Sequence, residues 1–509
     1  MSLLRRFKHS SCCADLALWV ACSRVSPERG RVTVEARTLA RCGYDEPLRG
    51  YFEMWYSVKL FLCGMLVCLA GLILSPEPLQ AQAKTKRSKK DAAVVPGVAD
   101  YQSKNFMVRT DLPPDEAKDL LKRLETMLGL IEKYFEHKLN SPIGMFVVKD
   151  INAWPKEALG QLDPAGLESV QTGGGLTIGQ TRTSNATGQV LDAKAVVYAI
   201  ADRGTPQHEA VHAYCILSFG RTGPTWYAEG MAEIGQYWTD KGLGVHCHEI
   251  VMKYLKSQEP KELTEIVDVA DSTGDSWENY AWRWVLCHML ANNPNYAPRF
   301  KPLGLGLLNG KDVSFETVYG PMAKEINFEY QFFLRHIDQG YRADLCAWDW
   351  KAKYTSCKGS TPFTAKVDAN KGWQPSRISV ESGQSYDYSS SGTWKTSATG
   401  TAVDADGGEE GAGRLVGIIF DEYKLSEPFN LGTYGSFTPP QSGSLMLRCD
   451  DKWHELADNS GKMQVRLKLT GKGNPLPMPE AKANAKEAPA KTEKSKADKT
   501  PKEKSAKPG

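Results

Sequence analysis

The stretch 207-QHEAVHAYCILSFGRTGPTWYAEGMAE-233 places two histidines and three glutamates in an otherwise apolar span. Residues four positions apart lie on the same side of a helix. His208 and His212 can therefore hold one metal ion while Glu209 points toward an open coordination position. The alternative is an ordinary helix that carries surface histidines. The motif favours a helix with a zinc site.

A second acidic pair follows after a chain reversal. Glu229 and Glu233 are one helical turn apart, and the preceding residues 222–224 (TGP) are typical of a turn that brings two helices face to face. A catalytic zinc needs three protein ligands, and Glu229 supplies the third. Ligand histidines usually donate their other N–H to a carboxylate, which Glu233 can offer to His208 or His212. This pair favours the metal site over the exposed helix.

The motifs HEAVH and WYAEGMAE resemble those of the gluzincin metallopeptidases. They are similar in particular to the compact peptidase-MA-like bacterial group, a family of largely unknown function that shares H-E-x-x-H and then P-x-W-x-x-E-G-x-A. The resemblance covers roughly residues 99–345 and implies a zincin-like α+β domain there. It implies zinc on His208, His212 and Glu229, with Glu209 as general base and Glu233 as the carboxylate behind a ligand histidine.

The activity implied by this resemblance is zinc-dependent hydrolysis of peptide bonds. Zinc lowers the pKa of its bound water toward about 7, Glu209 takes the proton, and the hydroxide attacks a carbonyl polarised by the same ion. Such a site also needs a hydrogen-bond donor for the tetrahedral oxyanion. We assign this role to Tyr280 in the later segment WENYAWRW, with a purely structural tyrosine as the alternative.

Residues 99–345 alternate strand-like and helix-like segments, which predicts an α+β domain. The amphipathic stretch 113–139 begins with prolines and acidic residues, as helices do. Further helices are expected within 279–310 and 328–341. Four short segments are expected to be strands: 105–112, 143–150, 173–181 and 194–201.

The composition changes near residue 344, where Trp, Gly, Ser and Thr replace the helical periodicity. After a linker at 346–359, short apolar segments alternate with turn residues. This spacing is typical of a β-sandwich, which we place at 360–472. The expected strands lie within 376–400, 414–420, 442–450 and 461–470.

One loop of this sandwich carries Asp451, Glu455, Asp458 and Asn459, whose oxygens suit calcium, although a plain polar hairpin loop explains the same composition. The stretch resembles the calcium-dependent galactose-binding lectin of the PA-I type. The resemblance implies calcium on the side chains of Asp451, Asp458 and Asn459, the carbonyl of Glu455 and a carbonyl of the turn SGTWKTS (391–397). Asp458 stands where the family has asparagine, and its other sugar-contacting positions are not recognisable. The resemblance thus implies a carbohydrate-binding sandwich but does not support galactose as its ligand.

Residues 54–83 have the layout of a secretory signal peptide, with Lys59, a 15-residue apolar run over 60–74 and a small-residue site ending at Ala83. The run is shorter than the roughly 20 residues of a spanning helix, which is the alternative. We therefore expect export to the periplasm or the extracellular space. Translation is expected to start at Met54, which makes residues 1–53 a misannotated upstream extension.

Cysteines and further histidines leave alternatives open. Six cysteines follow residue 84, and an even number permits disulfides in an exported protein. Cys346 and Cys357 are the nearest pair, with free buried thiols as the alternative. His246, Cys247 and His248 suggest a second metal site, against which a short surface turn is favoured.

Length and charge restrict the function. A chain of 509 residues is too long for one ordinary core, and a net charge of +3 argues against a dedicated nucleic-acid binder. Residues 84–98 are expected to be a linker and the lysine-rich residues 473–509 a disordered tail. The sequence predicts an exported zinc metallopeptidase acting on peptides or proteins, without a membrane span after signal cleavage. The second hypothesis is a secreted or envelope glycan-binding protein whose protease-like domain is inactive.

Overall fold

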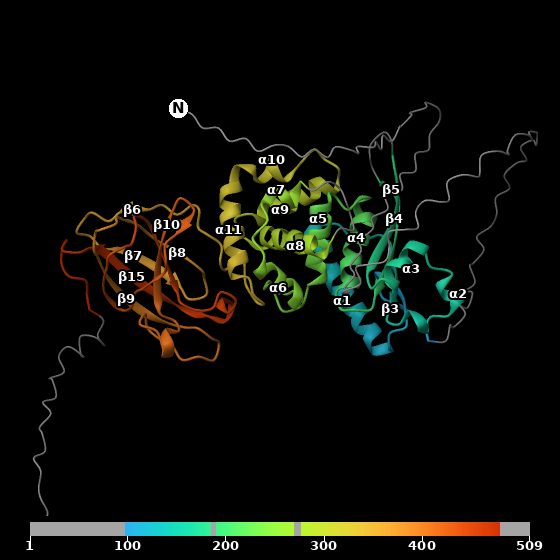
Figure 1. Cartoon of the computed structure of the whole chain (residues 1–509), viewed down its shortest axis with the longest axis horizontal. Coiled ribbons are helices and arrows are strands. Elements are labelled where there is room, and N and C mark those ends of the chain that lie inside the picture. The colour runs from blue at the N-terminus through green and yellow to red at the C-terminus, as the bar shows by residue number, and fades with distance from the viewer. Residues whose placement is uncertain (1–96, 185–189, 269–275, 479–509) are drawn as a thin grey trace, which may run out of the picture.

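The computed structural model describes residues 97–184, 190–268 and 276–478 (Figure 1). The expected upstream extension, the signal peptide and most of the first linker lie outside these ranges, as does most of the lysine-rich tail. Figure 1 shows a sheet, a group of helices and a β-sandwich in that order along the long axis. In the described ranges, no helix is long and apolar enough to cross a membrane. The chain is thus an α+β part followed by a β-sandwich.

The N-terminal sheet has five strands in the order β1-β2-β3-β5-β4. Strands β2, β3 and β5 are parallel, and β1 and β4 run antiparallel to their neighbours. The four strands expected from the sequence are confirmed, and β1 was not foreseen. The bounds are Ala99–Gln102 for β1, Phe106–Thr110 for β2, Ile143–Val148 for β3, Gly175–Thr183 for β4 and Val190–Ile200 for β5. β4 is at one end of the order, next to the metal-motif helix described below.

Helices cover both faces of this sheet. One face is packed by α1 (Pro114–Phe135) and α4 (Thr205–Phe219) through a core that includes Leu124, Val197 and Val211. The other face is packed by the short helices α2 (Lys156–Leu159) and α3 (Pro164–Gln171). Because α4 lies between the sheet and the remaining helices, its residues are shielded from water on several sides.

The remaining helices form the middle of the molecule (Figure 1). The sequence predicted α5, α8, α9 and α11, and these are confirmed. It missed α6, α7 and α10, whose five to nine residues are too short to show a clear helical period. The bounds are Thr225–Gln236 for α5, Glu249–Ser257 for α6, Leu263–Val267 for α7, Trp277–Asn292 for α8, Ala297–Leu308 for α9, Phe315–Tyr319 for α10 and Ala323–His336 for α11.

The expected β-sandwich is confirmed as two sheets around a second core. One sheet has the order β11-β10-β14-β8-β6 with β12 paired to β10, and the other has the order β13-β9-β15-β7. Ile378, Leu447 and Val465 contribute to the core between them. The bounds are Thr355–Ser356 for β6, Phe363–Asp368 for β7, Gln374–Val380 for β8, Tyr386–Lys395 for β9, Leu415–Asp421 for β10, Lys424–Leu425 for β11, Phe429–Asn430 for β12, Tyr434–Phe437 for β13, Gly443–Cys449 for β14 and Ser460–Leu469 for β15. Residues 391–397, expected to be a turn, are mostly the end of β9.

An aromatic cluster joins the sandwich to α11. The ring of Phe332 on α11 lies 4.9 Å from that of Trp453 in the sandwich and 6.5 Å from that of Trp348. The cluster continues onto Ile418 and Met446 on the outer side of one sandwich sheet. Burying these rings removes a large apolar area from water, which stabilises the contact between the two parts.

Residues 346–359, expected to be a linker, instead take part in this junction. The buried carboxylate of Glu329 on α11 accepts a hydrogen bond of 2.7 Å from the backbone N–H of Trp348 and one of 2.9 Å from the indole N–H of Trp350. The same range contains β6, which pairs with β8. The tryptophans are fixed because their N–H groups meet a buried acceptor, and the segment holds the two parts together.

Candidate metal centre

Helix α4 carries the HEAVH motif and is buried along most of its length. The carboxylate of Asp202 lies just before the helix and accepts hydrogen bonds from the N–H groups of Gly204 at 3.0 Å and Thr205 at 2.6 Å, which have no partner within the helix. Gly220 ends it with a φ of 75°, a left-handed conformation that glycine adopts readily. Every residue from Thr205 to Ile216 is buried. A polar side chain here costs free energy unless it has a partner.

His208 and His212 of α4 and Glu229 of α5 converge on one point. The Nε2 atoms of the two histidines are 3.1 Å apart, and each lies 3.3 Å from Oε2 of Glu229. All three residues are at most 1 % exposed. The chain reversal at 222–224 folds α5 against α4 and produces this arrangement, as the sequence predicted. Within the described ranges, this is the one cluster of acidic, histidine and cysteine side chains that could hold a metal ion.

The carboxylate of Glu229 lacks the hydrogen bonds that buried polar atoms normally make. Neither carboxylate oxygen of Glu229 accepts a hydrogen bond from a described residue. Two imidazole nitrogens and a carboxylate oxygen that face one another at this separation repel unless a proton or a cation lies between them. The triad therefore has the composition and the spacing of a metal site.

Glu233 approaches the triad from behind. Its Oε1 lies 3.1 Å from Nδ1 of His208, on the side of the ring opposite to the converging Nε2. The sequence left open whether Glu233 would pair with His208 or His212, and the structure places it at His208. A carboxylate at this distance favours the tautomer that carries the proton on Nδ1, in which Nε2 can bind a cation.

The buried carboxylates favour positive charge at the triad. Burial alone would lower the pKa of His208, but Glu229 and Glu233 raise it well above its ordinary value. Burial alone would raise the pKa of Glu229, but the charges of His212 and His208, whose Nε2 atoms lie 3.3 Å from its Oε2, hold it well below its ordinary value. Such a centre favours a cation, which a metal ion supplies without protonating the histidines.

Glu209 lies beside the triad and is equally buried. Its Oε2 accepts a hydrogen bond of 2.7 Å from the hydroxyl of Thr177 on β4. Burial raises the pKa of Glu209, although the charges of His208 and His212 act in the opposite direction. A raised pKa brings a carboxylate closer to the range in which it accepts protons near neutral pH. Sequence reasoning missed Thr177, which was seen only as one residue of an expected strand.

Tyr280 lies next to the centre. It is buried on α8, and its ring centroid is 6.2 Å from that of His208. The guanidinium of Arg283, one turn further along, lies 5.6 Å from the centroid of the same tyrosine ring. The structure thus brings the expected oxyanion donor close to the triad.

The other histidines and the cysteines form no metal group in the described part of the chain. The ring of His248 packs edge-on against that of Tyr237 with centroids 5.3 Å apart. The six cysteines of the described ranges, which include Cys346 and Cys357, are free thiols. Free thiols, one of the two alternatives, are therefore what this structure has. Residues 246–248 remain better interpreted as a surface turn.

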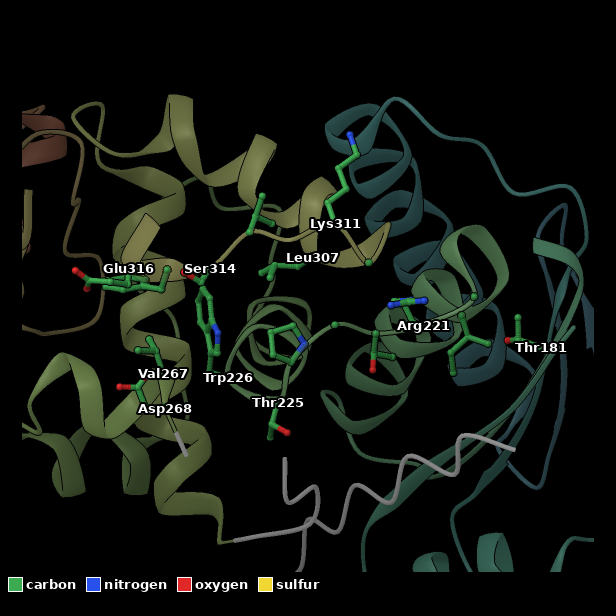
Figure 2. Close-up of a pocket in the computed structure, with 18 of the residues that line it drawn as sticks. Thr181, Arg221, Thr225, Trp226, Val267, Asp268, Leu307, Lys311, Ser314 and Glu316 are labelled. Carbon is green, nitrogen blue, oxygen red and sulfur yellow. The ribbon is translucent and has the colours of Figure 1, made fainter. Parts of the chain in front are cut away.

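A cavity of about 750 Å³ opens beside the triad, although no triad residue lines it (Figure 2). Its wall includes Ile216, one helical turn after His212, and Thr225, one turn before Glu229. Figure 2 shows Arg221 on one side of Trp226, and Asp268 and Glu316 on the other. The cavity therefore offers an aromatic surface with opposite charges at its two ends, next to the metal centre.

The sandwich loop expected to bind calcium joins β14 to β15. Oδ2 of Asp451 and the amide oxygen of Asn459 are buried without a hydrogen-bond partner among the described residues. Oδ2 of Asp458 accepts a hydrogen bond of 3.3 Å from the N–H of Ala398, and burial raises the pKa of Asp451. The acidic side chains of this loop do not converge as the triad does. The loop thus has two buried oxygens without a hydrogen bond, from Asp451 and Asn459, but its acidic side chains do not form a complete set of calcium ligands.

Comparisons with known proteins add little to this description. No protein-family model matches the chain, and no curated protein matches it. Among solved structures, the chain is similar to one described as "EclA N-terminal domain; PllA-like lectin", with 20 % sequence identity and a TM-score of 0.18. The match covers 21 % of this chain and 95 % of that chain. This likeness is weak and confined to about a fifth of the protein.

Proposed function

We propose that this protein is an exported zinc-dependent hydrolase that cleaves peptide bonds. The observation that carries the proposal is the convergence of His208, His212 and Glu229, with Glu209 buried beside them. All four residues belong to the HEAVH and WYAEGMAE motifs. A protease-like domain that had lost its activity would be expected to lack at least one of these groups, which supports the enzyme over an inactive relative.

The donor set supports zinc as the metal. Two imidazole nitrogens with one carboxylate oxygen form a known ligand set of catalytic zinc, which keeps a fourth position open. Tetrahedral bonds of about 2.0–2.1 Å place ligand atoms about 3.3 Å apart. The three separations here are 3.1, 3.3 and 3.3 Å. Glu233, behind His208, supplies the hydrogen-bond acceptor that ligand histidines usually have.

Each neighbouring residue has a role in this proposal. Bound zinc supplies Lewis-acid chemistry, which activates water near neutral pH and polarises a carbonyl oxygen. Glu209 accepts the proton of the attacking water and returns it to the leaving amine. Tyr280 donates a hydrogen bond to the oxygen on which negative charge develops. The cavity around Trp226 and Arg221 binds the part of the peptide next to the cleaved bond.

The first test is zinc-dependent cleavage of a peptide library by the purified full chain. We expect new amino termini, detected by mass spectrometry, that disappear when a chelator removes the metal and return when zinc is added back. Magnesium should not restore cleavage, because it prefers oxygen ligands in octahedral geometry. Cleavage that persists in protein shown to be free of zinc would refute the proposal.

A second function is supported by the sandwich loop. We propose that the unsatisfied oxygens of Asp451 and Asn459, together with Asp458, bind calcium and through it a carbohydrate. A cation would satisfy both buried oxygens and would stabilise the ionised form of Asp451, which burial disfavours. In this proposal backbone carbonyls of Glu455 and of residues 391–397 supply the remaining ligands, so the acidic side chains need not converge as they do in the triad.

We expect calcium to raise the melting temperature of the full chain, since a ligand at about 100 times its dissociation constant stabilises the folded state by about 2.7 kcal/mol. Asp451→Asn should remove this shift. Asp450→Asn is the matched control, because Asp450 is the exposed neighbour of Asp451 and should leave the shift unchanged. Equal shifts in wild type and Asp451→Asn, or no shift in wild type, would contradict the calcium site.

A further inference from the structure

Strand β4 lies directly against Glu209. Alternate residues of a strand face the same side, and β4 presents Gly175, Thr177 and Gly179 on the side that faces α4. A Cβ atom on Gly175 would lie 2.6 Å from Cγ2 of Thr205 and 2.8 Å from Oε1 of Glu209. A Cβ atom on Gly179 would lie 2.7 Å from the side chain of Ile216. The strand therefore packs so closely on α4 that larger side chains at the two glycines would collide with it.

Thr177 is the polar contact in this row of small residues. Its hydroxyl lies 2.7 Å from Oε2 of Glu209 and 2.9 Å from the backbone oxygen of the same residue. Both residues are 1 % exposed, so water does not compete for the hydrogen bond. A hydrogen bond to a buried carboxylate is charge-assisted and stronger than one between neutral groups. This contact holds one carboxylate oxygen of Glu209 on the sheet side of α4.

Glycine is required at position 175 by the lack of space for a side chain, and not by the backbone conformation. Its φ is not in the left-handed region, so alanine could adopt the same backbone. Its carbonyl accepts a hydrogen bond of 2.8 Å from the hydroxyl of Ser169 on α3, which anchors this end of β4. Its pairing with Ala199 of β5 fixes the register of the strand. An added methyl group would therefore press on the side chains of both Thr205 and Glu209.

We infer that Thr177 is the positioning residue for the general base Glu209 and that Gly175 supplies the space its carboxylate occupies. The catalytic meaning of this inference rests on the proposed hydrolase function. The structural meaning, that β4 fixes the orientation of the Glu209 side chain, stands on the contacts alone. The two can therefore be tested separately.

In the active enzyme, Thr177→Val is expected to lower kcat by about 10- to 100-fold, because a misplaced general base loses most of its contribution. KM and the zinc dissociation constant should stay within about twofold, since Thr177 does not contact the triad. Thr177→Ser retains the hydroxyl and should restore kcat. Gly175→Ala should act like Thr177→Val, whereas Gly144→Ala is the control, because a Cβ there meets nothing within 4 Å.

The metal-free protein gives a readout that does not depend on activity. Thr177→Val, Glu209→Ala and the double variant form a cycle of melting temperatures. If the hydrogen bond fixes Glu209, the loss in the double variant falls short of the summed single losses by about 2–4 °C. Additive losses, or wild-type kcat in Thr177→Val, would overturn the inference. A wild-type protein that cleaves no peptide would refute the proposed function, and the melting cycle would then decide the inference by itself.

Discussion

His212→Ala is expected to lower the zinc affinity of the protein by more than about 100-fold, because losing a mere outer partner of a ligand already costs about 10- to 100-fold. His212 is buried, and its Nε2 lies 3.3 Å from Oε2 of Glu229. Its removal leaves one histidine and one carboxylate, which hold zinc weakly. Elemental mass spectrometry of the purified full chain should find about one zinc per wild-type molecule and almost none in the variant.

His288→Ala is the matched control for this loss. His288 is also a helical histidine, on α8, and it is mostly buried, but its ring stacks on that of Phe333 instead of joining the triad. Truncating it removes a similar volume without removing a ligand, so zinc content should stay at the wild-type level. Full zinc content in His212→Ala would contradict the metal centre. Melting curves of both variants separate loss of zinc from loss of folding.

The triad was predictable because its geometry is encoded locally. The spacing of His208 and His212 sets both side chains on one side of a helix wherever that helix lies in the fold. Glu229 requires one more assumption, that residues 222–224 reverse the chain. The reversal does lie there, between Gly220, which ends α4 and was not foreseen, and Pro224, which precedes α5. The identity of the metal is not encoded in this way and stays a prediction.

Contacts between distant elements were not predictable from spacing. The partner of Glu233 depends on how α5 is rotated against α4, which no local pattern determines. The hydrogen bond from Thr177 to Glu209 joins residues 32 positions apart, across a sheet edge and a helix. The only available signal was the alternation of small residues in GLTIG, which indicates close approach to another element without naming that element.

In the fold, too, local features were predictable and contacts between distant segments were not. Periodicity predicted four of the five strands of the first sheet, but their order depends on pairing between segments far apart in the sequence. Residues 346–359 were interpreted as a linker because helical periodicity ends there. Their tryptophans instead fill the junction with α11, and Glu329 binds their N–H groups. A buried glutamate with such donors could not be recognised before the helix and the sandwich were placed together.

Glu209→Gln is expected to lower kcat by about 100- to 10,000-fold while zinc content stays at one per chain, because general-base catalysis contributes rate enhancements of that size. The amide has nearly the shape of the carboxylate, so the hydrogen bond from Thr177 and the packing against Gly175 are retained. It cannot accept a proton from the attacking water. Single-turnover cleavage of a peptide identified in the library, measured beside zinc content, checks both parts of this expectation.

Glu233→Gln is the informative control. It makes the same change from carboxylate to amide, but behind a ligand histidine, so it should affect zinc affinity instead of kcat. Glu233 contacts His208 through Nδ1, so its loss should weaken zinc binding by about 10- to 100-fold and leave kcat of the zinc-saturated enzyme nearly unchanged. If Glu209→Gln cleaved at the wild-type rate, Glu209 would not be the base. If both variants lost zinc, Glu209 would act on the metal site, and its position beside the triad would have a structural rather than a catalytic meaning.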